Sequence, residues 1–249
     1  MRFFDAELRK AHRRHDLLLC LLVPLIVVAW AGGTAPGSQE ELAQGYRSLF
    51  YSLPILHAIL LPVTTALLAS RLWDMEIKGC TRSLLYTLQS RRSLFTAKAV
   101  LGLLEILLIT LLELAAAVLL GKLYGYTDAI EPMQLVYLFL CTLAVDGMLF
   151  FLEFLVMLLS SGPLVALCMG IVGTLLGIFS AFLPQICSYF VIWGYYVPLS
   201  AYDIANWDQA THTVTYGFRG YQWGFLFFTA ALGIALYFAA RHCARNQEV

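Results

Sequence analysis

The sequence has few charged residues for its length. Only 13% of its 249 residues are Asp, Glu, Lys or Arg, whereas 60% belong to the set AVILMFWYC, and the mean hydropathy is +0.76. A soluble domain has about 25% charged and about 45–50% apolar residues, so this composition excludes a chain that faces water over most of its surface. Sixteen Lys and Arg balance sixteen Asp and Glu, so there is no basic field for nucleic acid. We predict an integral membrane protein.

The motifs of several functional classes are also missing. The six cysteines are scattered and form no C-x-x-C pair, which argues against a disulfide framework or a zinc site and favours buried, small apolar side chains. There is no G-x-x-x-x-G-K-[ST] phosphate loop, because Gly121-Lys122 has neither the upstream glycine nor the hydroxyl residue that would bind magnesium. This chain therefore cannot hydrolyse ATP by that route.

Intramembrane proteolysis is not indicated either. Glu41 and Arg47 are separated by five residues, unlike the E-E-x-x-x-R element of membrane-embedded CAAX-type proteases. Of the five histidines, only His57 lies in a long apolar run, so a pair of metal-binding histidines is missing. Residues 177–180 lack the second glycine of a nucleophile elbow. We predict no catalytic residue, metal or cofactor on this chain.

Six apolar runs are long enough to be considered as membrane spans, since crossing the hydrocarbon core takes about 20 residues of helix. We therefore expect an all-α polytopic membrane protein, with residues 1–249 forming a single transmembrane domain. The first run follows basic residues and contains an A-x-A triplet, as a signal peptide does, but we expect it to be retained. The predicted spans are 17–33, 48–70, 97–120, 133–159, 162–182 and 222–240.

The distribution of basic residues orients these spans, because Lys and Arg accumulate in short cytoplasmic loops. Five precede the first span, six lie between or border the second and third spans, and two follow the sixth, which accounts for thirteen of the sixteen. Both termini are therefore predicted to be cytoplasmic. The loops of the opposite side are acidic, with Glu40, Glu41, Asp128, Glu131, Asp203 and Asp208.

Two segments outside the spans are expected to form structure at the membrane surface. In residues 1–15, Phe4, Leu8 and Ala11 share one helical face opposite four basic residues. This pattern indicates an amphipathic helix in the headgroup layer, and a frayed basic tail is the alternative. Residues 183–221 are too long for an idle loop and contain an aromatic run, so we expect a short outer helix or a re-entrant segment there.

The loop between the second and third spans is predicted to contain a further amphipathic helix, at about 74–92. The polar residues Glu76, Arg82 and Gln89 surround a set of leucines. A short helix of this kind at the membrane surface can be bound by a partner protein. This loop resembles the cytoplasmic coupling helix of ABC-2 type membrane domains. Residue by residue, Glu76 takes the acidic place and Lys98 opens the third span, while Gln89 stands where that family has proline. The residues to which the resemblance assigns contact with an ATPase are Asp74, Glu76, Lys78, Gly79, Arg82, Leu84, Leu85, Leu88 and Arg91.

The resemblance extends to the six-span layout, the amino-terminal helix and the outer segment. Within the superfamily, the small size and the start Ala6-Glu7-Leu8-Arg9-Lys10 resemble the permease subunits of lantibiotic-immunity transporters of the mutacin, epidermin and nisin type; bacitracin-resistance permeases look alike at this level. The resemblance to lantibiotic-immunity permeases implies that the chain is a multi-pass subunit in a bacterial plasma membrane and that its transporter exports a cationic antimicrobial peptide. The implied partners are two separate ATPase subunits, which bind ATP and magnesium, and a second permease, which is the same or a related chain.

Four carboxyl groups and one imidazole lie inside the predicted spans: Glu105, Glu113, Asp146, Glu153 and His57. Charges at mid-bilayer cost about 2.5 to 3.5 kcal/mol on insertion scales, so such acids usually face the bundle interior or water. Asp146 and Glu153 are seven residues apart and share a helical face, and the matching depth of His57 and Glu113 suggests that they pair. These groups either line a path for a cationic substrate or fix helix packing.

Two further alternatives follow from the same spans. The intramembrane acids would also suit a proton-coupled secondary transporter, although the repeated halves that are common in that class are absent. In the fifth span, Gly170, Gly173 and Gly177 include a G-x-x-x-G pattern, which allows close helix approach. Because the resemblance places the first and fifth spans between two permeases, we expect these glycines at that interface.

Overall fold

The computed structural model describes residues 16–33, 38–78, 91–160, 162–183, 185–208 and 213–246. The amphipathic helix expected at 1–15 lies outside the described residues, and so does most of the coupling helix, at 79–90. Both stay predictions.

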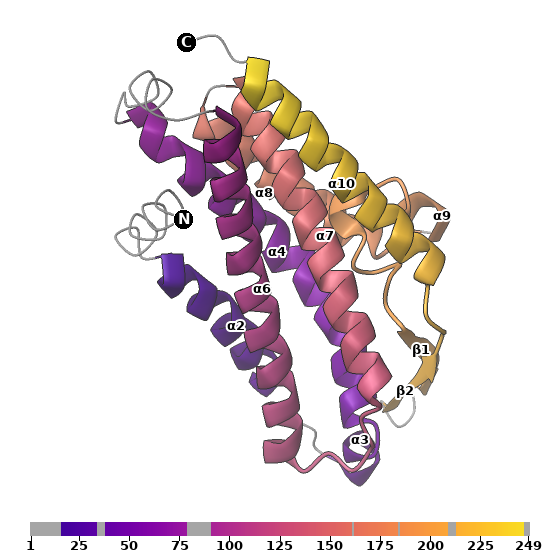
Figure 1. Ribbon diagram of the computed structural model, residues 1–249. Coiled ribbons are helices and arrows are strands. Elements are labelled where there is room, and N and C mark those ends of the chain that lie inside the picture. Colours follow the sequence, from indigo (N-terminus) through magenta and orange to yellow (C-terminus); the bar gives the residue numbers. More distant parts are fainter. Residues whose placement is uncertain are drawn as a thin grey trace.

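The described residues form six long helices, each of which overlaps one of the predicted spans, and Figure 1 shows their arrangement. Five of them, α4, α6, α7, α8 and α10, are long and apolar enough to cross a membrane. The first run forms α2, but its apolar part, Asp16–Val27, is too short to be counted with the five, so the number of six spans stays a prediction. The helix bounds are Asp16–Gly33 (α2), Gly45–Lys78 (α4), Arg91–Tyr124 (α6), Pro132–Ser160 (α7), Pro163–Ser180 (α8) and Trp223–Asn246 (α10).

Proline marks both the starts and the interiors of these helices. Pro132 and Pro163 occupy the first helical position of α7 and α8, where the missing N–H would have had no partner in any case. Pro24 lies inside α2, and Pro54 and Pro62 lie inside α4. Interior prolines are tolerated in membrane helices because neighbouring helices satisfy the freed backbone groups.

Helix α7 is central to the bundle and packs against α10, α4, α6 and α8, while α4 also packs along α8 and α2 packs along α6. Large side chains of α7, including Phe150 and Phe154, are fully buried. Phe154 meets Trp73 of α4 and Phe95 of α6 in edge-to-face contacts, with ring centroids 5.6 and 5.5 Å apart, and Phe150 packs beside Phe154. These aromatic contacts hold α4, α6 and α7 together.

A two-stranded antiparallel hairpin follows the fifth long helix, so the all-α prediction is wrong in this segment. Strand β1 spans Tyr202–Asp208 and β2 spans Thr213–Phe218, with Tyr202 opposite Phe218 and a bulge between Ile204 and Asn206. A lone hairpin is marginal, and this one is anchored on α4. The Tyr216 N–H donates to Gln44 Oε1 at 3.0 Å, and Ser48 Oγ donates to the Tyr216 hydroxyl at 3.2 Å.

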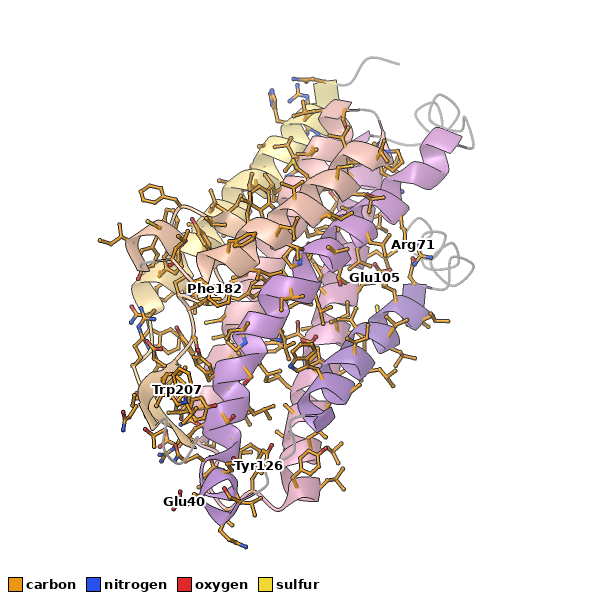
Figure 2. All side chains as sticks on the ribbon, turned by 180° about the vertical axis from the view of Figure 1, so that it is seen from behind. Glu40, Arg71, Glu105, Tyr126, Phe182 and Trp207 are labelled. Atoms are coloured by element: carbon orange, nitrogen blue, oxygen red, sulfur yellow. The ribbon has the colours of Figure 1, made fainter. Side chains whose placement is uncertain are left out.

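The bundle has two chemically different ends. At the basic end, α4 stops at Lys78, α6 begins at Arg91 and α10 finishes at Asn246 (Figure 1). At the acidic end lie the hairpin, the 125–131 loop and the short helix α3 (Gln39–Leu42), whose Glu40 and Glu41 are exposed (Figure 2). The separation of the two ends agrees with the charge pattern on which the orientation is based; the orientation in a membrane stays a prediction.

Candidate functional site

Polar side chains from three helices meet in the interior of the bundle. His57 of α4 lies with its Nε2 atom 3.2 Å from Glu113 Oε2 of α6, and the two residues are only 3% and 2% exposed. The matching depth of these residues in consecutive spans therefore corresponds to a real contact. The other ring nitrogen, Nδ1, lies 3.3 Å from Thr142 Oγ1 of α7, so the imidazole joins α4, α6 and α7 at one level.

Asp146 completes this group from α7. Its Oδ1 accepts a hydrogen bond from the hydroxyl of Tyr196, whose ring stands edge-on to the His57 ring with centroids 5.9 Å apart. We call His57, Glu113, Thr142, Asp146 and Tyr196 the His57 cluster; all five are almost completely buried. Unpaired charges are costly in an apolar interior, so contacts within the cluster oppose separation of the elements that carry it.

Glu153 has a different partner from the same part of the chain. Trp193 donates from its indole Nε1 to Glu153 Oε1 at 3.5 Å, and Glu153 is fully buried. Asp146 and Glu153 share a face of α7, as their spacing predicts, and the segment 192–196 covers that face. This segment contains the 3-10 helix η1 (Ile192–Gly194), which packs against α8, α4 and α7. The aromatic run therefore folds back into the bundle.

Glu105 lies apart from the His57 cluster, beside α2. The thiol of Cys20 donates to the main-chain carbonyl of Glu105 at 3.9 Å, and Glu105 is largely buried. At the start of α2, Asp16 forms an ion pair with Arg71 of α4 at 3.5 Å. The four intramembrane acids thus have three environments: Glu113 and Asp146 meet around His57, Glu153 meets Trp193, and Glu105 lies along α2.

The glycines of α8 lie in contacts within the chain, and their expected place between two permeases stays a prediction. A Cβ atom on Gly170 would come within 3.1 Å of the Pro62 carbonyl of α4, and one on Gly173 would overlap the Trp193 ring. All three glycines of α8, Gly177 included, are buried. The close approach that they permit is therefore used by α4 and η1 of the same chain, and the exposed apolar side chains of α8 lie elsewhere on that helix.

The residues assigned to ATPase contact lie at the basic end or outside the described residues. Asp74, Glu76 and Lys78 belong to the end of α4, and Arg91 begins α6. The remaining coupling residues, Gly79, Arg82, Leu84, Leu85 and Leu88, are in the segment that is not described.

The helices that flank this segment are tied together just inside the basic end. Lys98 of α6 is buried; its ammonium group donates to the Leu72 carbonyl of α4 and lies 5.5 Å from the centre of the Trp73 ring. This contact links α4 to α6 close to the ends that border residues 79–90.

Three residues of the buried polar groups were missed in the sequence: Thr142, Trp193 and Tyr196. Two of them belong to the aromatic run at 189–196, for which the sequence predicts a short outer helix or a re-entrant segment. In the part of the chain that the structure describes, no group of three or more His, Cys, Asp or Glu side chains is arranged to hold a metal ion.

Comparison with known proteins decides the class. A family model described as ABC-2 family transporter protein matches residues 3–177, which is well over half of the chain. The chain belongs to the ABC-2 transporter family. No curated protein matches the sequence. As a member of this family the chain is a multi-pass membrane permease of an ABC transporter, a transport subunit that works with ATPase subunits and is not itself catalytic.

The matched region includes most of the residues discussed above. It contains α2, α4, α6 and α7, the loop at 79–90, and four members of the His57 cluster. Tyr196 and Trp193 lie beyond it. The aromatic segment that covers the acids of α7 is therefore outside the region by which the family is identified.

Proposed function

We propose that this ABC-2 permease exports a cationic amphipathic antimicrobial peptide, as lantibiotic-immunity transporters do, from a bacterial plasma membrane. The observation that carries the proposal is the excess of carboxyl groups inside the bundle. Four acids lie in the spans, whereas among the described residues of the bundle the buried basic side chains are His57 and Lys98. A cationic substrate that enters between the helices would supply the missing positive charge.

In the conformation described, the acids are already in contact with partners from the same chain. Glu113 meets His57, Asp146 meets Tyr196 and Glu153 meets Trp193. Transport would therefore require these contacts to exchange for contacts with the substrate. A carboxylate that changes from an internal partner to a cationic side chain remains paired throughout, which keeps the cost of the exchange low.

The drive for this exchange would come from the ATPase subunits. Two of them, with ATP and magnesium bound, would dock on residues 74–92, and a second permease, the same or a related chain, would complete the passage. Closure of the ATPases would displace α4 and α6, which Lys98 and Leu72 hold together, relative to α7 and η1. The acids would then face the passage, and the exposed Glu40 and Glu41 at the other end would attract a cationic peptide.

Two alternatives belong to the same proposal. A bacitracin-type or other amphipathic drug or lipid exporter would use the same coupling region without needing all four acids. A proton-coupled transporter would instead use Glu105, Asp146 and Glu153 as a relay and would not need ATPase subunits; membership of the ABC-2 family argues against it.

The test is co-expression with the ATPase subunits from the same operon, followed by ATPase assays on the purified complex with nisin as the probe. We expect a stable complex whose turnover is stimulated by nisin. Glu76→Ala with Arg82→Ala should lower all turnover, because the docking helix is damaged. Asp146→Asn with Glu153→Gln should remove only the stimulation, and Glu131→Gln, an exposed acid outside the bundle, is the matched control.

Three outcomes would contradict parts of this proposal. If no ATPase co-purifies and the reconstituted protein moves nisin on a pH gradient alone, the transporter is proton-coupled. If turnover is stimulated equally in the Asp146→Asn/Glu153→Gln variant, the acids serve packing. If an uncharged amphipathic compound stimulates turnover and nisin does not, the cationic peptide is the wrong substrate.

A further inference from the structure

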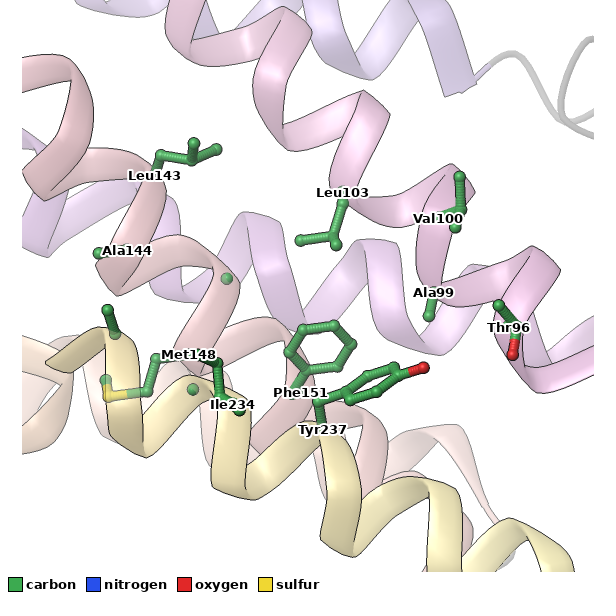
Figure 3. A pocket seen from close by; sticks show the side chains of 13 residues that line it. Thr96, Ala99, Val100, Leu103, Leu143, Ala144, Met148, Phe151, Ile234 and Tyr237 are labelled. Carbon is green, nitrogen blue, oxygen red and sulfur yellow. The ribbon is translucent and has the colours of Figure 1, made fainter. Parts of the chain in front are cut away.

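A groove runs between α6, α7 and α10, away from the His57 cluster. It encloses about 400 Å³, within the range of pockets that hold small molecules. Its walls are formed largely by apolar side chains, among them Leu103, Leu143 and Phe151 (Figure 3). Nothing in the proposed export function uses this groove.

Two glycines create the groove. Gly233 brings α10 close to α7, because a Cβ atom there would lie only 3.3 Å from Met148 Cα. Gly147 then leaves a hollow on the adjacent surface of α7, where the nearest atom to an added Cβ would be Leu103 Cδ2 at 3.7 Å. The groove is therefore a consequence of absent side chains on two helices that touch.

The groove opens sideways from the bundle. Val100 and Ile234 line it and are 41% and 59% exposed. In a membrane permease, the side of a spanning helix faces hydrocarbon unless another subunit covers it. An apolar opening at this position matches an acyl chain better than a water-soluble ligand.

The polar groups of the lining lie together at one end. Figure 3 shows Thr96 and the Tyr237 hydroxyl at the same end of the groove. The centroids of the Tyr237 and Phe95 rings lie 5.7 Å apart. Tyr237 of α10 and Phe95 of α6 therefore lie at the same level of the bundle, where the two helices run antiparallel. This is the end of the groove that points to the basic end of the bundle.

Two arginines lie one helical turn beyond this polar end. Arg92 precedes Thr96 by four residues, and Arg241 follows Tyr237 by four, so each arginine shares a helix face with a residue of the groove. Arg92 is exposed and Arg241 is partly exposed. Both arginines therefore lie nearer than the groove to the basic end of the bundle.

We propose that this groove binds an anionic phospholipid, with one acyl chain between α6, α7 and α10 and the phosphate held by Arg92 and Arg241. An apolar channel that ends in Thr96, Tyr237 and two cations has the polarity of such a lipid along its length. Arginine suits the phosphate because its planar group donates two parallel hydrogen bonds. The bound chain would link α10 to α6, one of the helices that flank the coupling loop.

The test is native mass spectrometry of the purified protein with phosphatidylglycerol and phosphatidylcholine of identical acyl chains. We expect one phosphatidylglycerol to stay bound and phosphatidylcholine to bind at least about fivefold more weakly, since each basic side chain near an anionic headgroup contributes about that factor. Arg92→Gln with Arg241→Gln should remove this preference. Lys122→Gln, at the opposite end of α6, is the matched control.

The acyl-chain site has its own variant. Gly147→Leu would place a branched side chain in the hollow and should weaken binding of both lipids by more than about tenfold, because several buried methylene groups are displaced. Gly224→Leu, at a glycine with nothing within 4 Å of an added Cβ, is the control for the glycine change. Loss of fold is excluded by comparing the thermal unfolding midpoints of the two variants.

Each remaining outcome overturns the proposal. Equal binding of the two lipids would refute the role of the arginines. Retained binding in Gly147→Leu would place the lipid elsewhere. If Gly147→Leu instead converts a dimer to a monomer, a second copy of the chain covers the groove. None of these outcomes depends on the exported substrate.

Discussion

Replacing Gly173 by alanine tests the finding that the α8 glycines serve packing within the chain. The added Cβ would overlap the Trp193 ring, so the indole must move and its hydrogen bond to Glu153 must break. Overpacking of this kind costs about 1–3 kcal/mol, and leaving a buried carboxyl group without a donor costs about 1–3 kcal/mol. The gain from removing a helical glycine, about 1 kcal/mol, offsets part of this.

The expected net loss in the free energy of unfolding is about 1–5 kcal/mol. For a chain of this length, 1 kcal/mol corresponds to a change in Tm of about 2–4 °C, so Gly173→Ala should lower the midpoint by about 2–20 °C. The assay is thermal unfolding of the detergent-purified protein at a fixed scan rate, with size-exclusion chromatography to report the oligomeric state. Gly224→Ala is the control, because an added Cβ meets nothing there.

A second-site change makes the assignment specific. Trp193→Leu removes the ring that the new methyl group would overlap, so the double variant should be less destabilised than the sum of the two single variants, by about 1 kcal/mol or more. The reasoning would be refuted if Gly173→Ala left Tm unchanged and shifted the protein from dimer to monomer. That result would return the glycines to a permease–permease interface.

Three further predictions concern the polar contacts. Glu113→Leu should destabilise the protein by about 3–5 kcal/mol, because it leaves His57 buried without its carboxylate partner. The double variant Glu113→Leu/His57→Leu should lose less stability than the sum of the two single variants, and additive losses in Tm would rule out the pair. Tyr196→Phe removes the donor to Asp146 and should cost about 1–2 kcal/mol, which an unchanged unfolding midpoint would contradict. Asp128 accepts from the N–H groups of Tyr46 and Arg47, the second and third residues of α4, at 3.1 Å. Alanine at position 128 should therefore cost about 0.5–2 kcal/mol and asparagine less in the same unfolding assay, and equal losses would argue against a cap.

The sequence was informative wherever a property depends on neighbouring residues. The lengths of the apolar runs predicted the long helices because the thickness of a bilayer is a local requirement on the chain. The spacing of Asp146 and Glu153 predicted one shared face because helical geometry is regular. The depths of His57 and Glu113 predicted a pair because consecutive spans cross the same layer in opposite directions.

The sequence failed where the outcome depends on how helices are rotated and stacked. It indicated close packing at Gly170, Gly173 and Gly177 without specifying the partner, because glycines permit contact with any helix. Strands β1 and β2 were missed because a hairpin of this length is stable only through its contacts with α4.

By itself, then, the sequence determined a membrane protein of long helices with acids placed inside them and basic residues gathered at one end. Only the tertiary structure decided which groups meet those acids. Trp193 and Tyr196 reach Glu153 and Asp146 across 40 and 50 residues of chain, and Asp128 reaches the start of α4 across more than 80. Contacts at such separations are set by the crossing and rotation of whole helices, which no local pattern of residues encodes.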